Sequence, residues 1–284
     1  MELTKIQKLR NGEHPGPIQP ATGQLQYRVE LPPPGGEPLD QDEAFFYLSN
    51  SSDKEKIRFH DYGTIFARKG LYEQLFYDRL KCQSPAKVAD VLSQAVLAGN
   101  GQLSELRVLD LGAGNGMAAE ALAAVGVSRQ VGVDIIDEAR AAAFRDRPGI
   151  YEDYFVADFC TLDDELRAEL QTWSFNCLVT VAALGFGDIP PKAIAAALDL
   201  IECDGWIVFN IKETFLEAGD TSGFSTFVRD LILSGYLDLH HMERYQHRLS
   251  VDGQPLNYFA IVGKKRGDDL PASIRAMVKA GASA

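Results

Sequence analysis

The chain is poor in several features that would assign it to a particular class of protein. It has four cysteines, none of them in a C-x-x-C pair and none near a histidine at zinc-ligand spacing, so we expect neither a disulfide framework nor a structural metal. No apolar run approaches the ~18 residues needed to cross a bilayer, and the first residues lack the apolar segment of a signal peptide. These absences lead us to expect a cytoplasmic protein with reduced thiols.

Positive charge is also scarce. The chain has 28 Lys and Arg residues against 40 Asp and Glu, a formal net charge of −12, which opposes broad binding to nucleic-acid phosphates or anionic lipid. Its short basic cluster, Lys264-Lys265-Arg266, is soon followed by Asp268 and Asp269. We therefore expect neither a nucleic-acid partner nor a membrane partner.

Proline and aromatic residues separate the N-terminal part of the chain from the remainder. Residues 1–40 are rich in proline and predict an extended arm. Residues 41–83 are rich in Phe and Tyr, and the apolar spacing within 70–80 is helical, which predicts a helical, aromatic lid or cap. The core is expected over 84–265 and a C-terminal tail over 266–284.

The expected core alternates strands with helices, a pattern typical of an α/β fold whose parallel sheet is covered on both faces. Two final strands are joined by turn residues at 251–254, which predicts a closing antiparallel hairpin. The expected strands, in chain order, are residues 107–111, 130–133, 154–157, 175–181, 206–211, 237–243 and 257–262.

A glycine-rich turn follows the first of these strands. Gly112, Gly114 and Gly116 lie between the strand at 107–111 and a helix expected over 117–125. Glycine permits positive φ and lets a ligand lie against bare backbone, and the helix start offers unpaired N–H groups. The pattern predicts a site for a polar or anionic ligand; a tight structural turn is the alternative.

Spacing distinguishes two kinds of nucleotide site. The dinucleotide fingerprint G-x-G-x-x-G would need its third glycine where this chain has Met117, so an NAD enzyme is a distant alternative. Asp134 ends the second strand, about 20 residues after the turn, where a carboxylate can accept hydrogen bonds from ribose hydroxyls. Asp158 ends the third strand beside Phe159, and it is placed either to contact a base or to cap the next turn.

The turn Asp110-x-Gly112-x-Gly114-x-Gly116, with acidic residues at the next two strand ends, resembles the first motif of the class I S-adenosylmethionine (SAM)-dependent methyltransferases. The resemblance covers roughly residues 84–264. It implies a seven-stranded, mostly parallel Rossmann-like sheet with an antiparallel final hairpin, and SAM as cofactor with S-adenosylhomocysteine as product. It also implies a set of cofactor contacts, namely Asp110, Gly112, Ala113, Gly114, Gly116, Asp134, Ile135, Asp158, Phe159 and Ala182.

The methyl acceptor can be narrowed from the residues after the fourth strand. Nucleobase methyltransferases usually carry Asn/Asp-Pro-Pro-aromatic there, whereas this chain reads Val181-Ala182-Ala183-Leu184, and its later Asp188-Ile189-Pro190-Pro191 lacks the aromatic. An aromatic cap suits a small, partly apolar metabolite. We therefore expect a small-molecule acceptor with an N, S or O nucleophile, contacted by Tyr72, Phe186 and Asn210.

A hydroxyl acceptor would also need a general base. The candidate catalytic residues are His60, Tyr62, Glu213 and His241. No metal is expected, because adjacent His240 and His241 point to opposite faces of a strand, and His247, which has no evident partner, is expected at the surface. A methyltransferase for protein side chains and a non-catalytic SAM-binding subunit remain alternatives. The arm and residues 270–278 are candidate surfaces for a homodimer.

Overall fold

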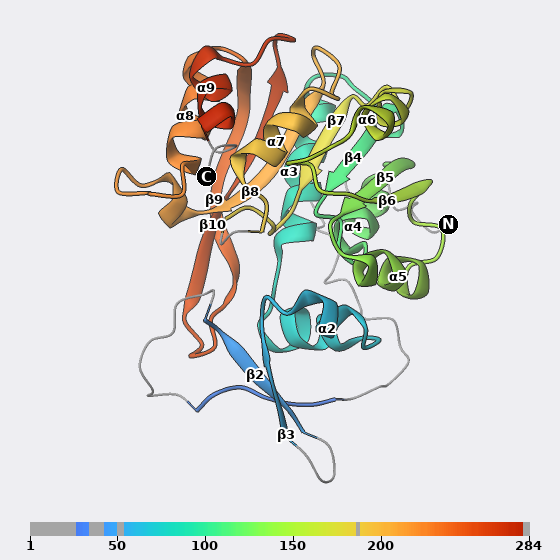
Figure 1. Cartoon of the computed structure of the whole chain (residues 1–284), viewed down its shortest axis with the longest axis vertical. Coiled ribbons are helices and arrows are strands. Elements are labelled where there is room, and N and C mark those ends of the chain that lie inside the picture. Colours follow the sequence, from blue (N-terminus) through green and yellow to red (C-terminus); the bar gives the residue numbers. More distant parts are fainter. Residues whose placement is uncertain (1–26, 34–42, 50–53, 186–187, 281–284) are drawn as a thin grey trace, which may run out of the picture.

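Two β-sheets organise the chain. The computed structural model describes residues 27–33, 43–49, 54–185 and 188–280, with the smaller sheet and the larger one towards opposite ends of its long axis (Figure 1). The larger sheet has seven strands, and their spatial order is β6 (Asp153–Val156), β5 (Arg129–Asp134), β4 (Arg107–Leu111), β7 (Cys177–Thr180), β8 (Trp206–Lys212), β10 (Pro255–Lys265) and β9 (Leu237–Leu249).

The first five strands of that order run parallel, and β10 is antiparallel to both β8 and β9. The predicted α/β fold with an antiparallel final hairpin is confirmed. Strands β4, β7 and β8 are buried along most of their length, as expected when helices cover both faces of a sheet. These helices are α3 (Ser84–Ala98), α4 (Met117–Val125), α5 (Asp137–Asp146), α6 (Asp164–Gln171), α7 (Pro191–Leu198), α8 (Phe224–Leu233) and α9 (Ala272–Ala280).

The alternation of side chains along the strands builds two separate cores. Val108 of β4 packs in the cluster that includes apolar residues of α3 and α4. Its neighbour Leu109 belongs to the cluster with residues of α6, α7 and α8. Because successive side chains point to opposite faces of a sheet, each buried strand serves both layers.

The smaller sheet belongs to a cap formed by the N-terminal part of the chain. Its elements are β1 (Arg28–Glu30), β2 (Phe45–Ser49), β3 (Lys54–Arg58), α2 (Tyr62–Phe66) and the π-helix η1 (Glu73–Arg79). A hydrophobic cluster of its own, including residues of β2, β3 and η1, holds these elements together. The cap was expected to be helical and aromatic; α2 and η1 are helices, but the cap also contains the strands β1, β2 and β3, which were not expected as a sheet.

The alternation along β2 explains why these aromatic residues form a strand. Phe46 and Leu48 are buried, whereas Phe45 and Tyr47 lie half-buried on the other face. The ammonium group of Lys56 lies 3.8 Å from the ring centroid of Phe45, and that of Lys54 lies 4.3 Å from that of Tyr47. A period of two with cations over the outer rings is characteristic of a half-covered sheet.

The cap contacts the core at two places, the β9–β10 hairpin and the turns that follow β4 and α5. In Figure 1 the β9–β10 hairpin extends from the core towards the cap, and the Leu249 N–H donates to the Leu80 carbonyl at 2.7 Å. On the other side, Glu73 of η1 pairs with Arg147 at 2.9 Å and accepts from the Asn115 side chain at 2.9 Å. These contacts fix the cap over the carboxyl ends of the parallel strands.

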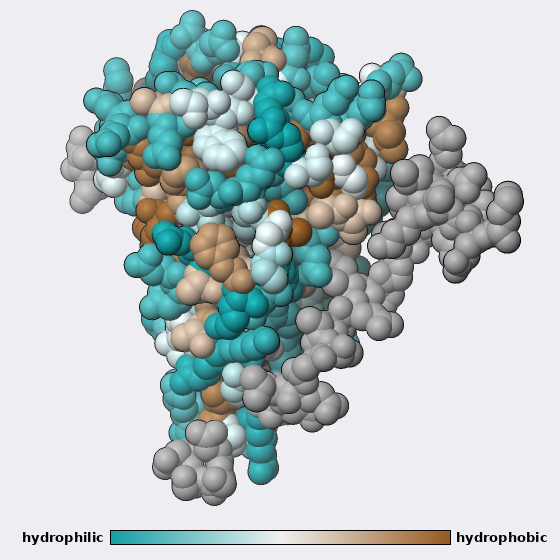
Figure 2. Space-filling view, turned by 90° about the vertical axis from the view of Figure 1, so that its right-hand side faces the viewer, coloured by the Kyte–Doolittle hydropathy of each residue, from teal (hydrophilic) through white to brown (hydrophobic). Residues whose placement is uncertain are grey.

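The surface agrees with this distribution of apolar residues. Figure 2 shows a face on which hydrophilic side chains predominate and hydrophobic ones lie in small groups. Within the described ranges, no helix combines the length and the apolar character needed to cross a membrane.

Candidate functional site

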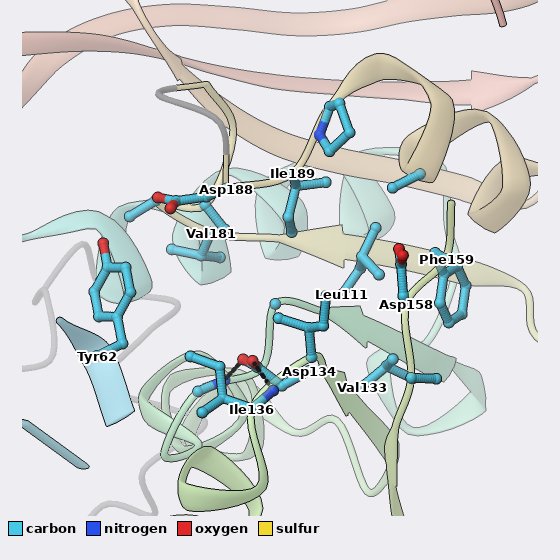
Figure 3. A pocket seen from close by; sticks show the side chains of 18 of the residues that line it. Tyr62, Leu111, Val133, Asp134, Ile136, Asp158, Phe159, Val181, Asp188 and Ile189 are labelled. Carbon is cyan, nitrogen blue, oxygen red and sulfur yellow. Dashed lines mark hydrogen bonds between the residues drawn. The ribbon is translucent and has the colours of Figure 1, made fainter. Parts of the chain in front are cut away.

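A first pocket lies at the carboxyl ends of β4 to β7, beneath the cap. Its empty volume, open mouth included, is about 830 Å³. In Figure 3, Tyr62 and Asp188 lie at one end of this pocket and Asp158 and Phe159 at the other, with Asp134 between them. Open α/β sheets bind their ligands at this edge.

The glycine turn forms part of the floor of the first pocket. Gly112, Gly114 and Gly116 all have positive φ, at 75°, 53° and 86°, and the first two line the pocket. A Cβ on Gly112 would lie 2.8 Å from Ile189 Cδ1 and 2.9 Å from Ala183 Cβ. The turn therefore needs glycine at position 112 for its backbone conformation and for close packing.

Asp134 holds the glycine turn from the next strand. Its Oδ2 accepts the Gly114 N–H at 2.9 Å, and its Oδ1 accepts the Ile136 N–H at 3.2 Å. Burial raises the pKa of this carboxyl from its ordinary value. Since each carboxylate oxygen can accept more than one hydrogen bond, the position suits the predicted contact with ribose hydroxyls.

Asp110 lies behind the turn and does not line the pocket. It is fully buried, and its Oδ2 accepts a hydrogen bond from the Tyr151 hydroxyl at 2.7 Å. Its Oδ1 has no hydrogen-bond partner among the described residues, and burial raises its pKa to about 7. Ala113 is likewise buried, with its N–H on the Val133 carbonyl at 3.0 Å, so both residues support the turn from beneath.

Asp158 and Phe159 line the far end of the first pocket. The carboxylate of Asp158 accepts the Cys160 N–H at 2.7 Å and the Thr161 hydroxyl at 3.2 Å, so it caps the following turn as well as facing the pocket. Ile135 lines the mouth and is 63% exposed. An apolar side chain this exposed beside a pocket is available to cover a ligand.

A second pocket adjoins the first and lies between the cap and the final hairpin. Its empty volume is about 490 Å³. The two pockets share Tyr62, Tyr72, Ala182 and Asp188. The remaining residues that line the second pocket are Phe59, His60, Phe76, Cys82, Leu184, His247, Arg248 and Tyr258.

Ala182, between the pockets, has a left-handed backbone with φ of 56°. Its N–H donates to Asn210 Oδ1 at 2.6 Å, and the Asn210 amide donates to Ser84 Oγ at 2.9 Å and to the Tyr245 hydroxyl at 2.6 Å. Asn210 is fully buried and lines neither pocket, so it positions Ala182 and does not itself face either pocket.

His60 and Asp188 come together from the cap and from the segment before α7. His60 Nδ1 lies 3.3 Å from Asp188 Oδ1. His60 lines the second pocket and Asp188 lines both. An imidazole oriented by a carboxylate is the usual arrangement of a general base. Asp188 was not among the predicted site residues, although it precedes the Pro-Pro pair that marks the start of α7.

A known family of proteins resembles the segment that forms most of the first pocket. Residues 109–209 match the family model described as a methyltransferase domain. This part of the chain is a methyltransferase domain.

Two curated relatives extend this finding. A ubiquinone biosynthesis O-methyltransferase of Thiobacillus denitrificans is 29% identical over 127 residues, which are 45% of this chain and 50% of the relative. A protein of the same name from Burkholderia vietnamiensis is 26% identical over 179 residues, covering 56% of this chain and 73% of the relative. This chain thus spans about half the length of the first relative.

Among solved structures, the N-methyltransferase NodS from Bradyrhizobium japonicum, in complex with S-adenosyl-L-homocysteine, aligns with a TM-score of 0.48 at 15% identity. The alignment covers 74% of this chain and 98% of NodS.

Two predicted catalytic residues, Glu213 and His241, line neither pocket. The Glu213 carboxylate accepts from Arg244 Nε at 2.6 Å, and this hydrogen bond holds its pKa below the ordinary value. His241 Nε2 lies 3.2 Å from Glu243 on β9. Tyr62, a candidate catalytic residue, and Tyr72, a candidate acceptor contact, line both pockets, whereas Phe186 lies outside the described residues.

Two further residues of the hairpin were missed or misplaced. His247 was expected at the surface, but it is buried, with Nδ1 2.6 Å from Ser84 Oγ and its ring centroid 4.1 Å from that of Tyr258. Burial lowers the pKa of His247 well below its usual value, so the ring is neutral. Ser84, the first residue of α3, joins this buried network through its hydroxyl. Arg248 was not singled out by any sequence motif.

Proposed function

We propose that this protein transfers the methyl group of SAM to a small-molecule acceptor. The observation that carries the proposal is the pair of adjoining pockets, one on the glycine turn and one under the cap, with Tyr62, Tyr72, Ala182 and Asp188 common to both. A cofactor and an acceptor that meet at such a boundary are held for reaction. The methyltransferase domain and the names of the two curated relatives support the same chemistry.

In this proposal the first pocket holds SAM. The backbone of Gly112 and Gly114 would hold the methionine part, Asp134 the ribose, and Ile135 with Phe159 the adenine, as the resemblance implies. Asp134 and Asp188 place acidic groups along the pocket. Negative charge near a sulfonium ligand is favourable, and that ligand supplies an activated methyl group when bound.

The second pocket would hold the acceptor. Its walls of Phe59, Tyr62, Tyr72 and Phe76 exclude water and leave room for a small molecule under the cap, which favours a metabolite over a protein side chain. Orientation of two reactants can supply on the order of 7–11 kcal/mol of the barrier. His60, oriented by Asp188, would accept the proton of an acceptor hydroxyl while the carbon–sulfur bond breaks and the carbon–oxygen bond forms.

Calorimetric titration with SAM, S-adenosylhomocysteine and NAD tests the cofactor. We expect the first two to bind and NAD not to bind. Asp134→Ala should weaken SAM binding by roughly 1–3 kcal/mol, because polar groups are left unpaired. Asp153→Ala, which removes an exposed carboxylate at the opposite end of the neighbouring strand β6, should leave it unchanged. Binding of NAD without binding of SAM would contradict the proposal. Unchanged SAM affinity in Asp134→Ala would show that Asp134 does not contact the ribose.

His60→Gln tests the general base. With labelled SAM and a panel of phenols as acceptors, we expect kcat to fall by roughly 10²–10⁴-fold, the usual contribution of a general base, while SAM affinity stays the same. His240→Gln is the matched control, since His240 lies beside Trp206 and Asp238 and lines neither pocket. An undiminished kcat in His60→Gln would show that the proton leaves by another route.

A further inference from the structure

Arg248 is a buried cation in the wall of the second pocket. Arg248 is 4% exposed. Its guanidinium carbon lies 5.4 Å from the ring centroid of Phe59 and 5.9 Å from that of Phe76. Within the described part of the chain, the side chain makes one hydrogen bond, from Nη1 to the Leu249 carbonyl at 2.8 Å, and no ion pair. A guanidinium has five N–H donors, so most of its capacity is unused.

Two other cations, the half-buried Arg147 and the buried Lys265, are satisfied by the chain itself. Arg147 pairs with Glu73 at 2.9 Å and with Glu120 at 2.8 Å. Lys265 donates to the carbonyls of Leu198 at 3.1 Å and Ile201 at 2.7 Å. A buried charge without a partner is costly, and Arg248 differs from these two in that its environment includes a pocket.

The charges around Arg248 define what the second pocket can accept. His247 is neutral, because burial lowers its pKa, and burial also raises the pKa of the Cys82 thiol, which therefore stays protonated. Burial lowers the pKa of Arg248 too, but an arginine starts far enough above neutrality to keep its charge. Arg248 therefore brings one fixed positive charge to this pocket, and Asp188 brings a carboxylate.

We propose that Arg248 binds a carboxylate of the methyl acceptor. This inference rests on the proposed function and adds the substrate class, a carboxylic acid with an aromatic or apolar body. A single guanidinium matches a planar carboxylate through two parallel hydrogen bonds. A phosphate dianion would meet only one positive charge and the opposing Asp188. The rings of Phe59 and Phe76 flank the guanidinium and suit the apolar body.

The wild-type protein offers the first test. The full chain, saturated with S-adenosylhomocysteine, is titrated with 4-hydroxybenzoate and with 4-hydroxybenzamide, its neutral counterpart, and binding is followed by ligand-detected NMR. We expect the acid to bind at least about tenfold more tightly than the amide. Inorganic phosphate should not displace the acid.

Variants at Arg248 provide the second test. Arg248→Met should abolish the preference for the acid while the affinity for S-adenosylhomocysteine stays the same. Arg244→Met is the matched control, since Arg244 lies on the same strand and pairs at the surface with Glu213; it should keep the preference. If Arg248→Met does not fold, Arg248→Lys keeps the charge without the planar fork and should weaken binding of the acid several-fold.

The outcomes separate this inference from the proposed function. Failure of the wild-type protein to bind S-adenosylhomocysteine overturns the proposed function. Binding of S-adenosylhomocysteine with equal or absent binding of acid and amide overturns only the role of Arg248. Retention of the preference in Arg248→Met, or displacement of the acid by phosphate, overturns it too.

Discussion

The two adjoining pockets differ in the sign of their buried charge. The first is built around carboxylates, with Asp134 in its wall and Asp110 behind its floor, and burial raises the pKa of both. The second contains the guanidinium of Arg248 beside the neutral ring of His247. This contrast suits the two proposed ligands, a cationic sulfonium in the first pocket and an anionic acceptor in the second, because each pocket would favour the charge of its own ligand.

The pockets differ equally in how the chain builds them. Most of the first pocket comes from turns that directly follow β4, β5, β6 and β7. The second combines cap residues such as Phe59 with hairpin residues such as Tyr258, which are almost 200 residues apart in the sequence. One pocket follows from local pattern and the other from the docking of two distant segments, and substitutions should reveal this difference.

The largest expected effect concerns the acidic floor of the first pocket. Burial raises the pKa of Asp110 from 3.8 to about 7 in the folded state. Between these values the folded protein holds a proton that the unfolded chain lacks. The contribution of Asp110 to the free energy of unfolding is therefore full below pH ~4 and is lost as the pH rises through ~7, at up to about 1.4 kcal/mol per pH unit and about 4 kcal/mol in all.

Asp110→Asn removes this titration and serves as the reference. Urea unfolding of both proteins between pH 4.5 and 8 should show wild type losing stability relative to the variant as the pH rises, with no further change above pH ~7.5. Curves that run parallel would mean that burial does not raise the pKa of Asp110, and that its carboxylate stays ionised behind the floor of the first pocket over this whole range.

The next largest effect concerns the glycine turn. Gly112 and Gly149 have nearly equal φ, at 75° and 76°, but a Cβ at Gly112 meets Ile189 and Ala183 below 3 Å, whereas a Cβ at Gly149 meets nothing within 4 Å. Both Gly→Ala variants should lose roughly 1–2 kcal/mol of stability from the backbone. Gly112→Ala alone should also lose SAM affinity, on the order of a hundredfold, because overpacking shifts the turn. Thermal unfolding measures the loss of stability, and calorimetry measures the affinity for SAM. Equal SAM affinity in both variants would contradict the proposal that SAM binds against the turn at Gly112.

Sequence reasoning predicted the larger sheet, and several of the residues it assigned to the cofactor line the first pocket, because both features depend on local pattern. Buried runs of apolar residues mark β4 to β8, and Asp134 and Asp158 stand at strand ends that parallel topology brings to one edge. The actual geometry at Asp110 was not predictable in this way. Its burial behind the turn depends on Tyr151, which follows α5 and belongs to no motif.

The structure of the cap and the lining of the second pocket could not be predicted from the sequence in the same way. The helical spacing within residues 70–80 predicted the helical part of the cap, but the alternation of Phe46 and Leu48 in β2 is too short to identify a strand without its partners. The polar residues at the end of β9 concealed how far that strand continues. His247 and Arg248 are buried only because the hairpin docks against the cap, a long-range contact that the sequence pattern does not indicate.

The smallest expected effect has the opposite sign and concerns the boundary between the pockets. Ala182 holds a left-handed backbone, which costs a non-glycine residue roughly 1–2 kcal/mol. Ala182→Gly should relieve this cost, lose part of the gain to the greater freedom of the unfolded chain, and raise the free energy of unfolding by up to about 1 kcal/mol. Ala183→Gly, where φ is not positive, should lower it by roughly 0.5–1 kcal/mol. Thermal unfolding of the two variants and of wild type measures both changes in stability. A loss of stability in both variants would mean that the hydrogen bond from the Ala182 N–H to Asn210 depends on the alanine, and that the shared wall of the two pockets is held by packing of its methyl group.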